Sequence, residues 1–208
     1  MKKFLVVPVV LFVLVIGYYA YNADAVYGQY VFNKLCEKEG GSRFYKPVEK
    51  GAGWLADGEF SDEDMKHMNL VADRSIGFLR FRRANGSLMD AHLKSGPALG
   101  TRREVIDGPE YTEIEPANFS IEPRYTQKMT RTNFNPHPDF LASQTFSKMQ
   151  HSIIALGSGG VVASHTGFGY AWTKPDRVVL NGPTAVTCHV GTDDEKSFYQ
   201  NIFKTGAR

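Results

Sequence analysis

The sequence predicts an α+β domain with an antiparallel sheet flanked by a few helices, preceded by a single N-terminal membrane or signal helix. Residues 4–21 carry no charge. Beyond them, short alternating apolar segments are separated by glycine, asparagine and proline turns, a pattern typical of strands joined as hairpins. Helical patterns with capping residues stand before and after these strands, and separate runs of helix and strand favour the α+β class.

The N-terminal head, residues 4–21, is long enough to span a membrane. A helix over these eighteen residues rises about 27 Å, close to the hydrocarbon thickness of a bilayer. Lys2 and Lys3 precede it and no lysine or arginine stands at its far end, so the N-terminus is expected in the cytoplasm. The predicted partner of residues 4–21 is therefore the cytoplasmic membrane, and residues 26–208 are expected on its outer side.

Residues 1–25 are interpreted either as an uncleaved signal-anchor or as a signal peptide. Small residues follow the apolar run at Ala23 and Ala25, so cleavage near Ala25 would release a soluble protein. In a signal-anchor, tyrosines are enriched at the outer membrane interface. The apolar run is also longer than the roughly 7–15 apolar residues of a signal peptide. We therefore favour the anchor. A buried helix of a soluble protein is the third alternative. The tyrosines near the end of the run are Tyr18, Tyr19, Tyr21, Tyr27 and Tyr30.

The body is expected to begin with a helix, a strand and a second helix. Apolar residues recur on one side of 26–38, and the glycines at 40–41 provide a stop. Residues 43–48 follow as a short strand. Ser61 can then cap a helix running to about residue 72, because Asp64 lies where its carboxylate reaches back to the start.

The middle of the chain predicts strands separated by irregular segments. Residues 75–83 alternate as a half-buried strand, and a turn follows at 85–86. Prolines and glycines make 95–123 a long loop with one or two short strands. Threonines favour a strand over 125–134, and the two prolines in 135–139 predict a rigid turn.

A glycine-tipped hairpin is the clearest pattern in the chain. Two apolar segments, 147–156 and 161–171, flank Gly157-Ser158-Gly159-Gly160. These glycines serve a turn rather than a phosphate loop, since no Lys-[Ser/Thr] follows and no helix begins there. The remaining predicted elements are strands at 177–180 and 184–190 and a capped helix from Thr192 ended by Gly206.

Cys36 and Cys188 are the two cysteines of the chain. An oxidising compartment favours a bridge between them, which would close a loop of about 150 residues and stabilise the fold by about 4–5 kcal/mol on the chain-entropy model. Two buried free thiols are the alternative. A redox-active pair is not expected, because no Cys-x-x-Cys spacing occurs.

Charge and motifs exclude several function classes. The formal net charge is +2, which argues against a nucleic-acid partner. Lys204-Thr205-Gly206 resembles a tripeptide of penicillin-binding enzymes, but no serine precedes a lysine by three positions. We therefore predict no catalytic set, no cofactor and no metal.

A few polar residues remain as site candidates. His137, Asp139, His151 and His165 are the acid/base groups that an enzyme would use. His151 and His165 lie on opposite arms of the predicted hairpin, so whether they share a face depends on the register of the tip.

The segment Leu35-Cys36-x-Lys38-x-Gly40-Gly41-x-x-x-Tyr45-Lys46-x-Val48, after an apolar head, resembles a pattern in small exported or membrane-anchored bacterial proteins of unassigned function. The resemblance covers about fifteen residues and implies a bacterial envelope location. It brings no catalytic residues.

The sequence favours a membrane-tethered periplasmic protein of the bacterial inner membrane. Residues 1–25 would be the anchor or signal, and residues 26–208 one extracytoplasmic α+β domain. Its expected role is a non-enzymatic interaction or accessory component of an envelope assembly, with an envelope protein as partner. The alternatives are an envelope hydrolase and a periplasmic protein that binds a metal or small ligand.

Overall fold

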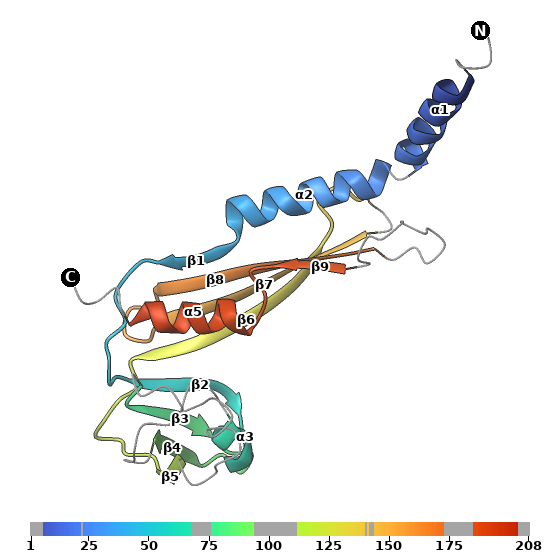
Figure 1. Ribbon diagram of the computed structural model, residues 1–208. Helices are drawn as coiled ribbons and strands as arrows, with labels where there is room; N and C mark the ends of the chain where they lie inside the picture. The colour runs from blue at the N-terminus through green and yellow to red at the C-terminus, as the bar shows by residue number, and fades with distance from the viewer. Residues whose placement is uncertain are drawn as a thin grey trace. The chain divides into compact units, whose positions relative to one another are not determined.

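A computed structural model describes residues 6–21, 23–67, 76–93, 112–139, 141, 144–172 and 185–203 (Figure 1). The described chain combines helices with a nine-stranded sheet, so the α+β prediction is confirmed. The helices are α1 (Val6–Tyr21), α2 (Ala23–Glu39), α3 (Asp62–His67) and α5 (Thr192–Ile202). The strands are β1 (Gly41–Phe44), β2 (Gly53–Glu59), β3 (Phe78–Arg82), β4 (Leu88–Leu93), β5 (Thr112–Pro116), β6 (Tyr125–Phe134), β7 (Gln144–Ala155), β8 (Val161–Trp172) and β9 (Ala185–Cys188).

The sheet is mixed rather than purely antiparallel. Its strand order is β1-β8-β7-β6-β2-β3-β4-β5, and β9 pairs with β8. β4 pairs antiparallel with both β3 and β5, but β2 pairs parallel with both β3 and β6. The connection from β2 to β3 contains helix α3, and crossovers of this kind join parallel strands. The predicted antiparallel arrangement therefore does not hold at β2, a strand that the sequence pattern did not reveal.

The described chain forms two compact units. The first contains residues 1–41, 130–150 and 166–194, and the second contains residues 42–129, 151–165 and 195–208. Strands β6, β7 and β8 contribute residues to both. Each unit has its own buried apolar cluster.

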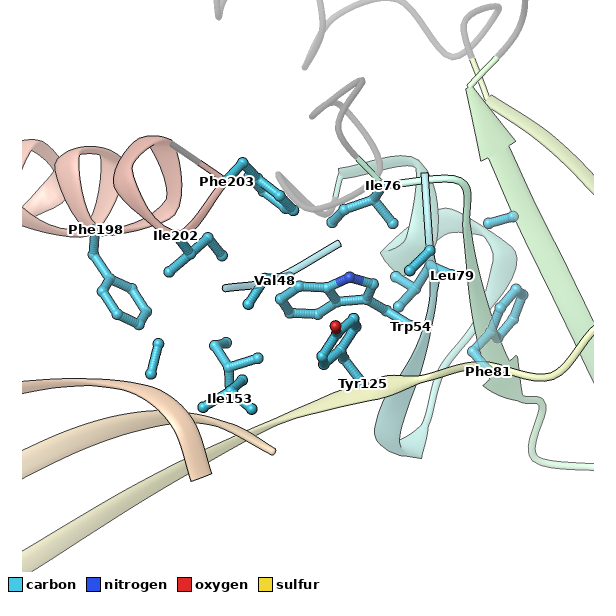
Figure 2. Close-up of a cluster of buried hydrophobic side chains, with 14 of the residues drawn as sticks. Val48, Trp54, Ile76, Leu79, Phe81, Tyr125, Ile153, Phe198, Ile202 and Phe203 are labelled. Atoms are coloured by element: carbon cyan, nitrogen blue, oxygen red, sulfur yellow. The ribbon is translucent and has the colours of Figure 1, made fainter. Parts of the chain in front are cut away.

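The second unit is built around Trp54, which is fully buried on β2 (Figure 2). Its indole lies 5.8 Å from the ring of Tyr125 and 6.3 Å from that of Phe203, measured between ring centroids. Helix α5 adds Phe198 and Ile202, both buried at 1% exposure or less. The helix therefore buries its apolar stripe against the strands, as the period of its sequence predicts.

The first unit packs helix α2 against the sheet through Phe32. The Phe32 ring lies 5.9 Å from that of Tyr170, and Phe146 lies 5.0 Å from the same ring. Beside this cluster, Cys36 at the end of α2 is bonded to Cys188 on β9, with a Cα–Cα distance of 6.2 Å. The predicted disulfide is confirmed.

Gly28 allows α2 to approach the sheet closely. A Cβ at this position would lie 1.9 Å from Gln144 Oε1 and 2.7 Å from the Tyr170 hydroxyl. Gln144 is only 4% exposed. Burial, aided by the charge of Asp24, raises the pKa of Tyr170 to about 12, so the phenol stays protonated and donates to the Ala25 carbonyl at 3.4 Å. The interface between α2 and the sheet is thus polar at its centre and has no space for a methyl group.

Gly28→Ala is expected to destabilise the first unit. The added methyl group overlaps a buried side chain, and overpacking of this kind costs about 1–3 kcal/mol, which exceeds the gain of about 1 kcal/mol from helix propensity. Urea denaturation measures the effect. Gly157→Ala is the matched control, because a Cβ there meets nothing within 4 Å. Equal stabilities of the two variants would contradict the close approach.

The local predictions have different outcomes. Ser61 caps α3 as expected: its hydroxyl accepts from the Asp64 backbone N–H at 3.1 Å, and its own N–H donates to the Asp64 carboxylate at 2.9 Å. The strand predicted at 75–83 is observed as β3, but its predicted half burial is wrong, because Phe78, Leu79, Arg80 and Phe81 are buried in succession. Three predicted features lie outside the described residues: the strand at 177–180, the end of the second helix near residue 72, and the end of the last helix at Gly206.

Helix α1 is apolar, but its described length is short. Among the described residues, no single helix is both long and apolar enough to cross a bilayer, although Val10–Tyr18 and Ala23–Glu39, bent by 57°, satisfy length and composition together. The single membrane helix over 4–21 therefore stays a prediction. Residues 1–5 lie outside the described part.

Candidate functional site

A solvent-open pocket of about 440 Å³ lies in the first unit. Helix α2 supplies one wall through Tyr27, and the segment 136–139 between β6 and β7 supplies the others. The lining residues are Tyr27, Pro136, His137, Pro138 and Asp139. Two of the four polar candidates, His137 and Asp139, are thus brought together in one pocket.

The loop that carries these residues is held in one conformation by Asn135. Its amide oxygen accepts from the His137 N–H at 3.0 Å, and its amide nitrogen donates to the Leu141 carbonyl at 2.8 Å. The Leu141 N–H in turn donates to the His137 carbonyl at 2.7 Å. Two prolines with fixed φ add to these bonds. The pocket wall is therefore preorganised, as the rigid turn predicted at 135–139 implies.

Aromatic rings continue from the pocket along α2. The Tyr27 ring lies 5.5 Å from the His137 imidazole and 6.4 Å from the Tyr30 ring. The Lys34 ammonium lies 5.9 Å from the Tyr30 ring and 2.9 Å from the Glu37 carboxylate. That carboxylate raises the pKa of Lys34, through its hydrogen bond first and its charge second. The pocket thus combines two rings and two prolines with the carboxylate of Asp139.

His151 and His165 belong to the second unit. The His151 imidazole lies 3.3 Å from the Gln127 amide, whereas the His165 imidazole lies 2.9 Å from the Ser42 hydroxyl and packs on the Phe198 ring. Both are at least nine-tenths buried. Within the described ranges, no three His, Cys, Asp or Glu side chains come together as a metal site.

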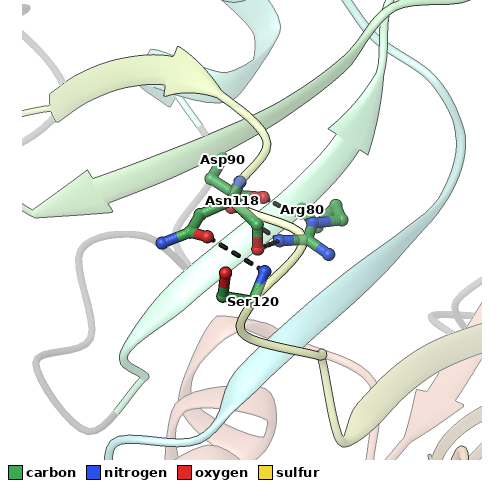
Figure 3. Close-up of polar contacts among 4 residues, drawn as sticks. All are labelled: Arg80, Asp90, Asn118 and Ser120. Carbon is green, nitrogen blue, oxygen red and sulfur yellow. Dashed lines mark hydrogen bonds and ion pairs between the residues drawn. The ribbon is translucent and has the colours of Figure 1, made fainter.

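A buried ion pair is the main polar feature of the second unit (Figure 3). Arg80 is 5% exposed and Asp90 is 2% exposed, and the guanidinium donates to both carboxylate oxygens at 2.6 and 2.7 Å. The burial of Arg80 was not predicted, because its partner strand β4 was not recognised in the sequence. Burial by itself raises the pKa of Asp90, but hydrogen bonds from Arg80 and the Asn118 N–H outweigh it and lower that pKa.

This ion pair also holds the loop after β5. The Asn118 N–H donates to Asp90 at 2.9 Å, and the Asn118 carbonyl accepts from Arg80 at 2.7 Å. Beside it, Phe119 is 74% exposed and Ile121 is 51% exposed. The loop therefore presents two large apolar side chains to solvent on a braced backbone.

No family model, curated protein or solved structure matches this chain. His137 and Asp139 were predicted as site candidates from the sequence, whereas Tyr27 was interpreted as part of an interfacial tyrosine belt. The spacing of Tyr27 from the turn at 135–139 gives no signal that the two meet, since only the fold brings α2 to that loop.

Proposed function

We propose that this protein is a membrane-tethered domain on the periplasmic side of the bacterial inner membrane, acting as an interaction component of an envelope assembly. The observation that carries the proposal is the exposure of α1. Val10 to Ile16 are seven consecutive large apolar residues, each 50–66% exposed. Successive helical residues are about 100° apart, so the apolar surface surrounds the whole helix.

A helix that is apolar on every side is unfavourable in water. Burying one such side chain stabilises by about 1.5–3 kcal/mol, and the lipid tails of a bilayer provide that environment over residues 4–21. The lysines at positions 2 and 3 favour an N-terminus in the cytoplasm. The Cys36–Cys188 bridge supports the outer side for the body, because disulfides persist in oxidising compartments.

The packing of Ala25 favours an anchor over a cleaved signal peptide. Ala25 is 7% exposed within α2, and its carbonyl accepts from the Tyr170 hydroxyl at 3.4 Å. Cleavage near this residue would remove the first turn of a helix that packs on the sheet. The domain therefore uses residues that a signal peptidase would discard.

The braced loop with Phe119 and Ile121 supports the interaction role. Exposed apolar residues on a preorganised backbone lose little conformational entropy on binding, which favours contact with a partner protein.

Charged substitutions in α1 test the tether. Leu11→Arg combined with Leu14→Arg is expected to move the protein from the membrane fraction to the soluble or degraded fraction, since each arginine near the centre of a membrane helix costs about 2.5–3.5 kcal/mol. Fractionation after an alkaline carbonate wash measures the shift. Val161→Arg combined with Met129→Arg is the matched control, because both positions are exposed in the body, and the control variant should stay with the membrane. Wild-type protein that the wash releases would contradict the proposal.

A further inference from the structure

We propose that the pocket formed by Tyr27, Pro136, His137, Pro138 and Asp139 binds an organic ammonium group. Its lining residues provide apolar and aromatic walls with one carboxylate. This combination matches a cation that carries its charge on a methylated or alkyl-substituted nitrogen. Such a cation is attracted by the faces of aromatic rings and is too large and too weakly hydrated to need several hydrogen bonds. The inference goes beyond the tether and the protein partner proposed above.

The aromatic part of the site comes from α2 and the loop together. Tyr27 and His137 have ring centroids 5.5 Å apart and planes tilted by 49°, so they form two adjoining walls rather than a closed stack. Tyr27 is 37% exposed, which leaves part of its surface available to a ligand. A cation within about 6 Å of such a ring is attracted by its electron-rich face.

The charge of the site favours a cation over an anion. Asp139 lines the pocket. Asp24 lies three residues before Tyr27 on the same helix, the spacing at which side chains are neighbours. Lys34 lies further along α2, where its ammonium pairs with Glu37 at 2.9 Å. A phosphate or carboxylate ligand would therefore face the Asp139 carboxylate, and the described lining residues include no lysine or arginine.

A sugar fits the pocket less well than an ammonium group. A sugar ring presents several hydroxyls, each of which requires a polar partner when it leaves water. The pocket lining offers Asp139, His137 and the Tyr27 hydroxyl, whereas Pro136 and Pro138 form apolar walls. A tetra-substituted ammonium needs no hydrogen bonds, so the apolar walls do not penalise it.

The preorganised loop makes the site ready to bind. The Asn135 side chain fixes the positions of His137 and Leu141, and its amide nitrogen also lies 3.4 Å from the Gln144 carbonyl. A ligand therefore does not have to order this wall. The ammonium could come from a lipid headgroup or from a free amine, because Tyr27 lies only six positions after the end of α1 at Tyr21.

The test is a titration of the full chain in non-ionic maltoside micelles with tetramethylammonium chloride, at constant ionic strength. Carbon-detected or proton–carbon NMR of the His137 imidazole and the Tyr27 ring follows binding. We expect saturable shifts of both residues at millimolar concentrations. tert-Butyl alcohol, a neutral molecule of similar shape, should give no saturable shift. Its binding as strongly as the cation, or the absence of any shift with the cation, would overturn the proposal.

Variants separate recognition of the cation from a change in folding. Asp139→Asn and Tyr27→Leu should each raise the dissociation constant by about 3- to 30-fold. Tyr27→Phe, which keeps the ring, and Asp57→Asn, at an exposed carboxylate of the second unit, should bind like the wild type. Thermal unfolding of each variant verifies that the domain is intact. Unchanged affinity in Asp139→Asn would contradict the site.

The source of the ammonium is resolved in bilayers. The full chain is compared in nanodiscs of phosphatidylcholine and of phosphatidylglycerol. Only phosphatidylcholine carries an ammonium group in its headgroup. Shifts of Tyr27 and His137 in phosphatidylcholine alone identify a lipid headgroup. Identical spectra in both lipids, with retained response to added tetramethylammonium, identify a soluble amine. Binding in micelles does not require a membrane, so failure of the tether and failure of this site are distinguishable.

Discussion

Removing the Cys36–Cys188 bridge is expected to lower the free energy of unfolding by about 2–5 kcal/mol. The two cysteines are 152 residues apart in sequence, so the bridge removes much conformational freedom from the unfolded chain. In the folded state it connects the end of α2 to β9, where both sulfurs lie beside the cluster of Phe32 and Phe168. Urea denaturation of the Cys36→Ala, Cys188→Ala double variant measures the loss.

Reduction of the wild-type protein provides the companion measurement. Adding dithiothreitol should lower the wild-type midpoint toward that of the double variant and leave the double variant unchanged. Alanine avoids the addition of a new hydroxyl to a partly buried position. If the wild type and the double variant unfold at the same denaturant concentration, the bridge does not stabilise the fold and the account of the first unit is wrong.

Asp90→Ala is expected to cost about 3–5 kcal/mol, because it leaves the buried Arg80 guanidinium without its carboxylate. The pair is almost inaccessible to water, with side-chain exposures of 6% for Arg80 and 3% for Asp90. The same substitution removes the acceptor of the Asn118 N–H, so the loop after β5 that carries Phe119 should also become less ordered. Calorimetry measures stability, and proteolysis after Phe119 reports on the loop.

A second arginine–aspartate pair provides the matched control. Arg83 binds Asp62 with the same two-bond geometry, at 2.7 and 2.5 Å, but its side chains are 33% and 41% exposed. Asp62→Ala should therefore cost much less than Asp90→Ala, because solvent screens this exposed pair. Replacing Arg80 and Asp90 together by Met and Leu should recover most of the stability, since no unpaired charge is then buried. Equal costs for Asp90→Ala and Asp62→Ala would refute the role of burial.

Acid tests the same pair without mutation. The folded pKa of Asp90 is lowered, so the unfolded state takes up a proton at a higher pH than the folded state. The stabilisation is therefore present above the ordinary aspartate pKa of about 4 and is lost as the pH falls through the lower folded value. The stability of Asp90→Asn should consequently fall less steeply below pH 4 than that of the wild type.

Local sequence signals predicted the elements that depend on neighbouring residues. The span of β6 was predicted at 125–134, as observed, because its threonine-rich run ends in a proline turn. The glycine tip between β7 and β8 and the Ser61 cap were also local features. Strands β2 and β4 were missed, since Gly53 and Gly58 in β2 and Asp90 and His92 in β4 weaken the apolar pattern. Their pairing in the sheet, rather than propensity, determines them.

The candidate site was only partly predictable for the same reason. His137 and Asp139 stand two residues apart in one rigid turn, so their proximity could be predicted from the sequence. Tyr27 is far away in the chain and reaches the turn only because α2 packs on the sheet at Gly28. The burial of Arg80 depends on β4 in the same way. Long-range contacts of this kind cannot be predicted from the local pattern of a single sequence.

The most direct measurement of the central claim is made on the full-length chain in bacterial cells. Cells are treated with a membrane-impermeant maleimide reagent, and membranes are then washed with alkaline carbonate and analysed without reductant. We expect the protein to stay in the washed membranes and Cys36 and Cys188 not to react until a reductant is added. Protein released by the wash, or thiols that react without reductant after lysis, would contradict a tethered domain that is oxidised outside the cytoplasm.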